Sequence, residues 1–194
     1  MRADDGGICA VPLAGDADVH EALPAGRRWT IPVVAFPVAA ALAAASVVRL
    51  GVSAHAVLVA AVVAVLVVLA AIDLRHRLLP NAIVLPATAA TLACQIAIAP
   101  DRAGEWLLGA LVGAGLLLVP SLIKPGAIGM GDVKLAALLG VALGAQVLSA
   151  LMLGLLAVAP VALALLLVRG SSALRATLPL GPFLALGATV VLLA

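Results

Sequence analysis

A chain of 194 residues in which 65% are hydrophobic and only 10% are charged has too much apolar surface for a water-soluble domain of that size. A formal net charge of +2 does not indicate nucleic-acid binding. The two cysteines, Cys9 and Cys94, are far apart and form no Cys-x-x-Cys pair, which argues against a disulfide framework and a cysteine zinc site. Several apolar runs approach the 20 or so residues that cross a bilayer, so the composition predicts an all-α, polytopic membrane protein.

The first 30 residues are polar and precede every apolar run. They include the acidic residues Asp4, Asp5, Asp16, Asp18 and Glu21 and end close to the basic pair Arg27 and Arg28. No apolar core directly follows the basic start, so we do not expect this segment to be a signal peptide. We expect residues 1–30 to form a poorly ordered cytoplasmic tail and residues 31–194 to form the transmembrane domain.

The apolar runs predict the membrane-spanning helices in chain order. The first four predicted spans cover residues 31–50, 55–72, 82–99 and about 105–123. Asn81 is expected to cap the third span, and Pro120 to help to terminate the fourth. A short fifth span, a sixth at about 147–168 and a last one at 177–194 complete the chain.

The boundary between the fifth and sixth spans needs a break. No charged residue occurs between Leu135 and Val168, and one helix of that length would extend for roughly 50 Å, well beyond a bilayer core. We expect the break at residues 144–146, Gly-Ala-Gln, and a kink at Pro160. This break gives about seven transmembrane helices, and six is the alternative.

The basic residues provide a test of this topology, because cytoplasmic loops carry an excess of lysine and arginine. With seven spans and the N-terminus inside, Arg49 and Arg102 lie outside, whereas the other basic residues lie on the cytoplasmic side. That side then holds Arg2, Arg27, Arg28, Arg75, Arg77, Lys124, Lys134, Arg169 and Arg175. If residues 135–168 formed a single span, Arg169 and Arg175 would lie outside, so the charge distribution favours seven spans.

Beyond the tail the sequence contains the acidic residues Asp73, Asp101, Glu105 and Asp132. Asp101 and Glu105 lie beside Arg102 in a predicted outer loop, and we interpret them as surface charges. Asp73 ends the second span and Asp132 begins the fifth. Two spans lie between them, so both are expected on the cytoplasmic side.

Each aspartate alone has a structural explanation. Asp132 can cap a helix N-terminus, and Asp73 can be a boundary charge balanced by Arg75 and Arg77. Within the bilayer, however, a carboxylate costs about 2.5–3.5 kcal/mol on insertion scales, which makes one at the membrane edge a functional candidate. As a pair, the two can share a proton, one acting as base on water and the other as acid, which is the chemistry of aspartic proteolysis.

Three segments resemble the type IV prepilin peptidase family, over about residues 55–194. In "IDLRHRLLPN", the resemblance maps the family's first catalytic aspartate to Asp73, and Pro80 and Asn81 match the residues that follow it. A second segment, "GMGDVKL", resembles the family's Gly-x-Gly-Asp-x-Lys motif. The third, "LPLGPFLALGA", resembles the glycine-proline-phenylalanine stretch that enters the last helix, where we expect Gly181 and Pro182 to shape the helix entrance.

In the Gly-x-Gly-Asp-x-Lys motif, the resemblance maps the second catalytic aspartate to Asp132 and the trailing lysine to Lys134. Gly129 and Gly131 have no Cβ atom, so the backbone can bend there and another segment can approach closely. Lys134 and Asp132 are two residues apart and point away from one another on a helix. Lys134 is therefore either a positive-inside anchor or a residue with a catalytic role.

The resemblance implies an aspartic endopeptidase of the inner, cytoplasmic membrane that removes leaders from prepilin or pseudopilin precursors, in type IV pilus assembly and protein secretion. Such precursors have a basic leader joined to an apolar helix. It implies membrane lipid as surroundings but no cofactor, metal or nucleic acid. The alternatives are another Gly-x-Gly-Asp intramembrane protease and a noncatalytic assembly or transport protein.

Larger members of the family are also N-methyltransferases and carry a cysteine-bearing region early in the chain. In this sequence the link between the first two spans is short, and no cysteine pair occurs. We therefore expect the short, peptidase-only form.

Overall fold

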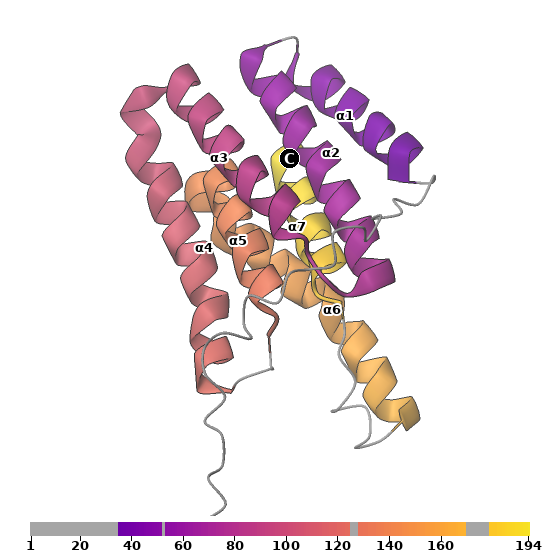
Figure 1. Cartoon of the computed structure of the whole chain (residues 1–194). Helices are drawn as coiled ribbons and strands as arrows, with labels where there is room; N and C mark the ends of the chain where they lie inside the picture. The colour runs from indigo at the N-terminus through magenta and orange to yellow at the C-terminus, as the bar shows by residue number, and fades with distance from the viewer. Residues whose placement is uncertain (1–34, 52, 125–127, 170–178) are drawn as a thin grey trace, which may run out of the picture.

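The computed structural model describes residues 35–51, 53–124, 128–169 and 179–194, and within these ranges every regular element is helical (Figure 1). The all-α class predicted from composition is therefore confirmed. The predicted N-terminal tail lies outside the described residues. The α-helices are α1 (Ala35–Leu50), α2 (Ala54–His76), α3 (Asn81–Ile98), α4 (Ala103–Ile123), α5 (Met130–Leu143), α6 (Val147–Arg169) and α7 (Gly181–Leu193).

Four segments are long and apolar enough to cross a membrane. They are Ala54–His76, Asn81–Ile98, Pro100–Ile123 and Met130–Val168, and α1 and α7 are shorter apolar helices. Large hydrophobic side chains also face outward, and Leu111 and Leu156 are 70% and 69% exposed. Such a surface suits lipid rather than water, so the chain is a multi-pass membrane protein.

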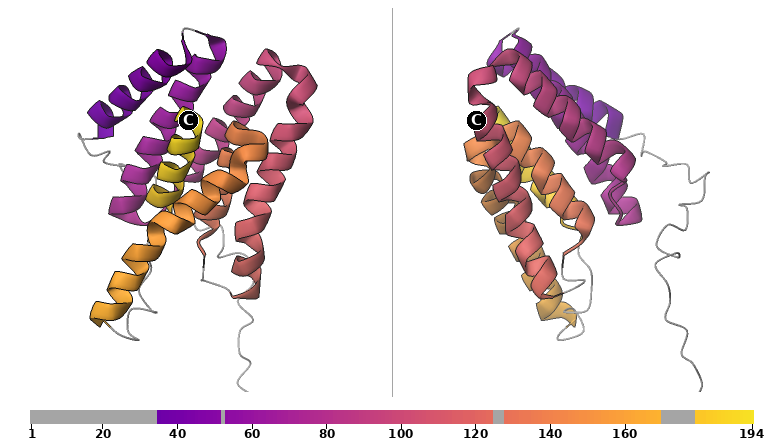
Figure 2. Two further views of the ribbon diagram at one scale, coloured as in Figure 1. Left: turned by 180° about the vertical axis from the view of Figure 1, so that it is seen from behind. Right: turned by 60° about the vertical axis from the view of Figure 1, so that its left-hand side comes forward.

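The break predicted between the fifth and sixth spans is confirmed. A short 3-10 helix, η3 (Gly144–Gln146), separates α5 from α6, and the chain turns back there (Figure 2). Gly144 has a φ of 56°, in the left-handed region that favours glycine. A kink was expected at Pro160. This proline lies inside α6, which continues as a helix on both sides of it, and the kink itself stays a prediction.

Two helix ends differ from the prediction. α2 extends to His76, so Asp73 lies within its last turn rather than at its end. Pro80 is the N-cap of α3, and its carbonyl accepts the backbone N–H groups of Ile83 and Val84 at 3.0 and 3.1 Å. The expectation that Asn81 caps this helix was wrong, because Asn81 is the first helical residue and its side chain is engaged elsewhere.

Successive helices alternate in direction, so their connections lie at two opposite ends of the bundle (Figure 1). One end holds the α2–α3 connection, the end of α4 with the start of α5, and the start of α7. The other holds the α1–α2 connection, a second 3-10 helix, η2 (Pro100–Arg102), and η3. Asp73 and Asp132 thus fall at the same end, as the even number of intervening spans predicted.

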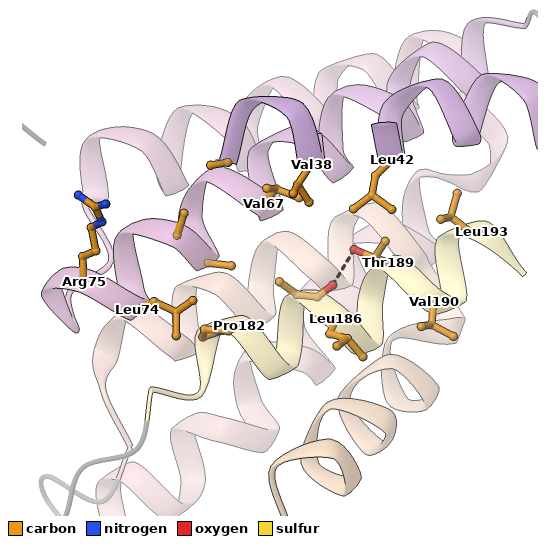
Figure 3. Close-up of a pocket in the computed structure, with 14 residues that line it drawn as sticks. Val38, Leu42, Val67, Leu74, Arg75, Pro182, Leu186, Thr189, Val190 and Leu193 are labelled. Carbon is orange, nitrogen blue, oxygen red and sulfur yellow. Dashed lines mark hydrogen bonds between the residues drawn. The ribbon is translucent and has the colours of Figure 1, made fainter. Parts of the chain in front are cut away.

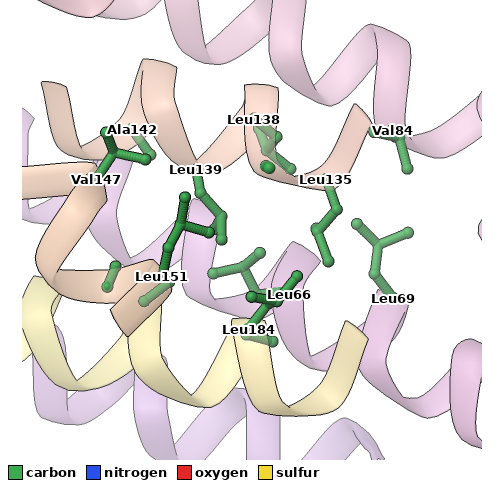
Figure 4. Packing of buried hydrophobic residues seen from close by; sticks show 14 of the residues in the cluster. Leu66, Leu69, Val84, Leu135, Leu138, Leu139, Ala142, Val147, Leu151 and Leu184 are labelled. Atoms are coloured by element: carbon green, nitrogen blue, oxygen red, sulfur yellow. The ribbon is translucent and has the colours of Figure 1, made fainter. Parts of the chain in front are cut away.

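The interior between α2, α5 and α7 is filled by leucines. Leu66, Leu69, Leu135, Leu139 and Leu184 are almost completely buried and pack against one another (Figure 4). Lipid tails are as apolar as leucine, so helix association in a bilayer depends on close van der Waals packing rather than on exclusion of water. This cluster fixes the relative positions of the three helices that carry the candidate site.

Small residues bring α4 and α5 into close contact. A Cβ atom built on Gly140 would meet the backbone oxygen of Gly109, and one built on Gly113 would lie 2.6 Å from the backbone oxygen of Ala136. Glycines spaced in this way let two helix backbones approach more closely than larger residues allow. The contact anchors α5, whose first turn carries Asp132, against the long helix α4.

Gly140→Ala should therefore lower the stability of the fold. The added methyl group has no room against Gly109, and overpacking of this kind costs about 1–3 kcal/mol. Gly115→Ala is the matched control, because nothing lies within 4 Å of a Cβ at that position of α4. Thermal unfolding in detergent should show a lower midpoint for Gly140→Ala only, and equal midpoints for both variants would contradict the close contact.

Candidate active site

Asp73 is a buried carboxylate in the last turn of α2. Only 5% of its surface is exposed, and the helix closes just beyond it, where the Arg77 N–H donates to the Asp73 carbonyl at 2.8 Å. Arg77 adopts a left-handed conformation, with a φ of 50°, which ends α2 and turns the chain toward α3. The side chain of Asp73 therefore stays inside the bundle, although the helix ends only a few residues later.

The start of α7 supplies the hydrogen-bond donor for this carboxylate. The backbone N–H of Gly181 donates to Asp73 Oδ2 at 3.1 Å, across 108 positions of sequence. Gly181 is the first residue of its helix, where N–H groups have no partner within the helix, and Pro182 after it has no N–H to satisfy. The free N–H group at the start of α7 thus stabilises the buried carboxyl group of α2.

Position 181 must also be glycine for steric reasons. A Cβ atom on Gly181 would lie 2.6 Å from Asp73 Oδ2 and 3.1 Å from Asp73 Cγ, closer than real Cβ contacts. The sequence indicated only that Gly181 shapes the helix entrance, so its direct contact with Asp73 was missed. The Gly-Pro pair at the start of the last helix was the signal that could have revealed it.

Asp132 lies in the first turn of α5 and is half-buried. Gly129 is the N-cap of this helix, and its carbonyl accepts the Asp132 N–H at 3.0 Å. The Asp132 carboxylate folds back over Gly129, with Oδ2 3.5 Å from the place of a Cβ at that position. Asp132 lies at the same end of the bundle as Asp73, and the helices that carry them, α5 and α2, pack against one another through the buried leucine cluster.

The two motifs that carry these aspartates also touch one another directly. Lys134 Nζ donates to Asn81 Oδ1 at 2.8 Å, which joins the N-terminal part of α5 to the first turn of α3. A Cβ on Gly131 would lie 2.9 Å from the Cβ of Leu79, in the connection between α2 and α3. Gly131 therefore permits, and Lys134 reinforces, the approach of α5 to the segment that follows Asp73.

Within the described part of the chain, the other two acidic residues lie at the opposite end of the bundle. Glu105 forms an exposed ion pair with Arg102 at 2.7 Å, and Asp101 is exposed beside them. This arrangement confirms that these residues are surface charges. Over the described part of the chain, no three His, Cys, Asp or Glu side chains are placed to hold a metal ion.

The helices and the site define a class of protein, a polytopic helical membrane protein with a carboxylate pair at one end of the bundle. Residues 60–168, more than half of the chain, match the type IV leader peptidase family. The chain therefore belongs to this family, whose members are peptidases of the aspartic type.

A curated relative supports this assignment. The prepilin leader peptidase/N-methyltransferase of Bacillus subtilis (strain 168) is 30% identical over 156 residues, which cover 80% of this chain. The chain spans 63% of that relative's length. No solved structure matches the chain.

Gly181→Ala should impair peptidase activity while the fold is retained. The new methyl group displaces the Asp73 carboxylate, and a misplacement of about 1 Å at a reacting group can cost roughly 100-fold in rate. Gly104→Ala, in the first turn of α4, is the control because a Cβ there has nothing within 4 Å. Cleavage rates of the two purified variants, compared at equal thermal stability, check this, and equal rates would show that the Gly181 contact is dispensable.

Proposed function

We propose that the protein is a membrane aspartic endopeptidase that removes the leader from prepilin or pseudopilin precursors, with Asp73 and Asp132 as its catalytic residues. The observation that carries the proposal is that these two aspartates, from motifs of the matched family, lie at the same end of the bundle. The Bacillus subtilis relative is a prepilin leader peptidase/N-methyltransferase, which supports the same substrate class.

In the proposed reaction, one carboxylate accepts a proton from a water molecule, whose oxygen attacks the carbonyl carbon of the scissile peptide bond. The other carboxylic acid protonates the leaving nitrogen as the carbon–nitrogen bond breaks. The products are the free leader carboxylate and a mature N-terminal amine. The hydrogen bond from Gly181 to Oδ2 orients Asp73, so that its other oxygen is available for proton transfer.

We assign the supporting residues of the two motifs to positioning. Lys134 and Asn81 hold the N-terminal part of α5 against the first turn of α3 through their hydrogen bond. Gly131 allows the close approach, and Gly129 and Pro80 are the N-caps of α5 and α3. Because the two aspartates lie on different helices, contacts of this kind set the distance between them.

We further propose seven spans, a cytoplasmic N-terminus and a cytoplasmic site in the inner membrane. The support is the distribution of charge between the two ends of the bundle. Arg75, Arg77 and Lys124 lie at the end that holds the aspartates, whereas Arg102 lies at the opposite end. Basic residues collect on the cytoplasmic side of membrane proteins, which supports a cytoplasmic position for the aspartates. On that side, precursors still carry their leaders.

We also propose that the protein cleaves its substrate without methylating the new N-terminus. α1 leads into α2 through residues 51–53, at the place where the bifunctional members are expected to carry their cysteine-bearing region. The mass of the product, made by the purified protein in the presence of a methyl donor, distinguishes the two forms of the enzyme.

Asp73→Asn and Asp132→Asn should each abolish leader removal, with a loss of at least about 1,000-fold, because neither member of the pair can carry out both proton transfers. Asp101→Asn is the control, since Asp101 is exposed at the opposite end. The measurement is cleavage of a candidate precursor from the same genome, with membrane insertion of each variant checked in parallel. Cleavage retained by either dyad variant would refute the assignment.

Single-cysteine labelling should place the two ends of the bundle on opposite sides of the membrane. In a background without Cys9 and Cys94, Leu78→Cys marks the end with the aspartates and Asp101→Cys the other end, and both positions are exposed. A membrane-impermeant maleimide should label Asp101→Cys on intact cells and Leu78→Cys only after permeabilisation. The opposite pattern would separate the site from cytoplasmic leaders and exclude the proposed reaction.

A further inference from the structure

An apolar groove runs between α1, α2 and α7 (Figure 3). Its volume is about 700 Å³, within the range of ligand-binding sites. Val38 and Leu42 of α1 form one wall, Leu186 and Val190 of α7 form the other, and Val67 of α2 lies between them. The groove is thus built by two consecutive helices near the start of the described chain and by the last helix.

One end of the groove lies near Asp73. Leu74 and Arg75, which line this end, directly follow Asp73, and Pro182 directly follows Gly181, the hydrogen-bond donor to Asp73. From there the groove follows α7 to Leu193, a rise of about 16 Å for a helix. A segment lying in the groove would therefore reach the candidate catalytic carboxylate at one end and extend along the membrane at the other.

The lining suits a helix rather than a polar peptide. Ala70, Ala71 and Ala185 line the groove, and small residues let a second helix approach closely in a bilayer. The hydroxyl group of Thr189 already donates to the Ala185 carbonyl at 2.7 Å, so it presents no free donor (Figure 3). Arg75, at the end beside Asp73, is the charged member among the described lining residues.

We propose that this groove binds the apolar helix of the substrate that follows the cleavage site, an inference that rests on the proposed function. Charge decides which part of the precursor enters. The apolar walls offer no counter-charge to a basic leader, whereas they match an uncharged helix. With the helix in the groove, the junction between leader and helix lies beside Asp73, so the groove selects where the chain is cut.

The first test compares two tryptophan variants of exposed leucines. Leu186 is 53% exposed and lines the groove, whereas Leu163 of α6 is 56% exposed and does not line it. Leu186→Trp fills the groove and should lower kcat/KM for the full-length precursor by about tenfold, mainly through KM, relative to Leu163→Trp. A short soluble peptide that contains only the cleavage site should be cut equally by both variants.

Equal kcat/KM for the full-length precursor in the two variants would overturn the groove proposal while leaving the peptidase intact. Failure of the unaltered protein to cut either substrate would instead contradict the proposed function. These outcomes separate the two claims.

The second test does not depend on the tryptophan variant folding correctly. A photoreactive benzoylphenylalanine at Val190, in the Asp132→Asn background that retains the precursor, should cross-link to the substrate helix. The same group at Leu163 should not. Capture of lipid alone or of a second copy of the chain at Val190 would show a different occupant and overturn the proposal.

Discussion

A carboxylate buried among membrane helices needs a hydrogen-bond donor, and the position of Asp73 determines how the other parts of the site are arranged. Its donor is the Gly181 N–H, at the start of a helix in which such groups lack internal partners. The donor is effective only if α7 begins against the last turn of α2, and only glycine leaves room for the carboxylate there. The buried charge thus fixes the meeting point of two helices that are distant in sequence.

The second half of the site is brought to the first by different contacts. Asp132 belongs to α5, which packs closely against α4 through glycine and against α3 through the Lys134–Asn81 hydrogen bond. The Gly131 backbone approaches Leu79, a few residues beyond Asp73. Each aspartate is therefore positioned by its own set of helices, and the short connection between α2 and α3 links the two sets.

The sequence predicted the features that depend on local chemistry. Charged residues are so sparse in this chain that Asp73 and Asp132 stand out as candidate site residues. The number of spans between them placed both on the same side of the membrane. The break at Gly144 followed from helix length, because no bilayer accommodates an unbroken run from Leu135 to Val168. Asn81 shows the limit of such reasoning, since a cap was predicted from residue type and the side chain instead meets a lysine 53 positions away.

Contacts between distant segments were beyond what a single sequence reveals. The Gly181 hydrogen bond and the groove beside it both depend on where α7 packs, which no local pattern specifies. Small residues such as Ala70 and Ala185 appeared as ordinary members of apolar runs, and only the fold places them on one surface.

The central claim is that Asp73 and Asp132 lie together in the folded protein. Cross-linking of an Asp73→Cys/Asp132→Cys double variant, in a background without Cys9 and Cys94, tests it most directly. A short bifunctional thiol reagent should join the two positions within one molecule and leave an Asp73→Cys/Glu105→Cys control unlinked, because Glu105 lies at the opposite end. Absence of the 73–132 link, or its formation only between molecules, would contradict the structure of the site.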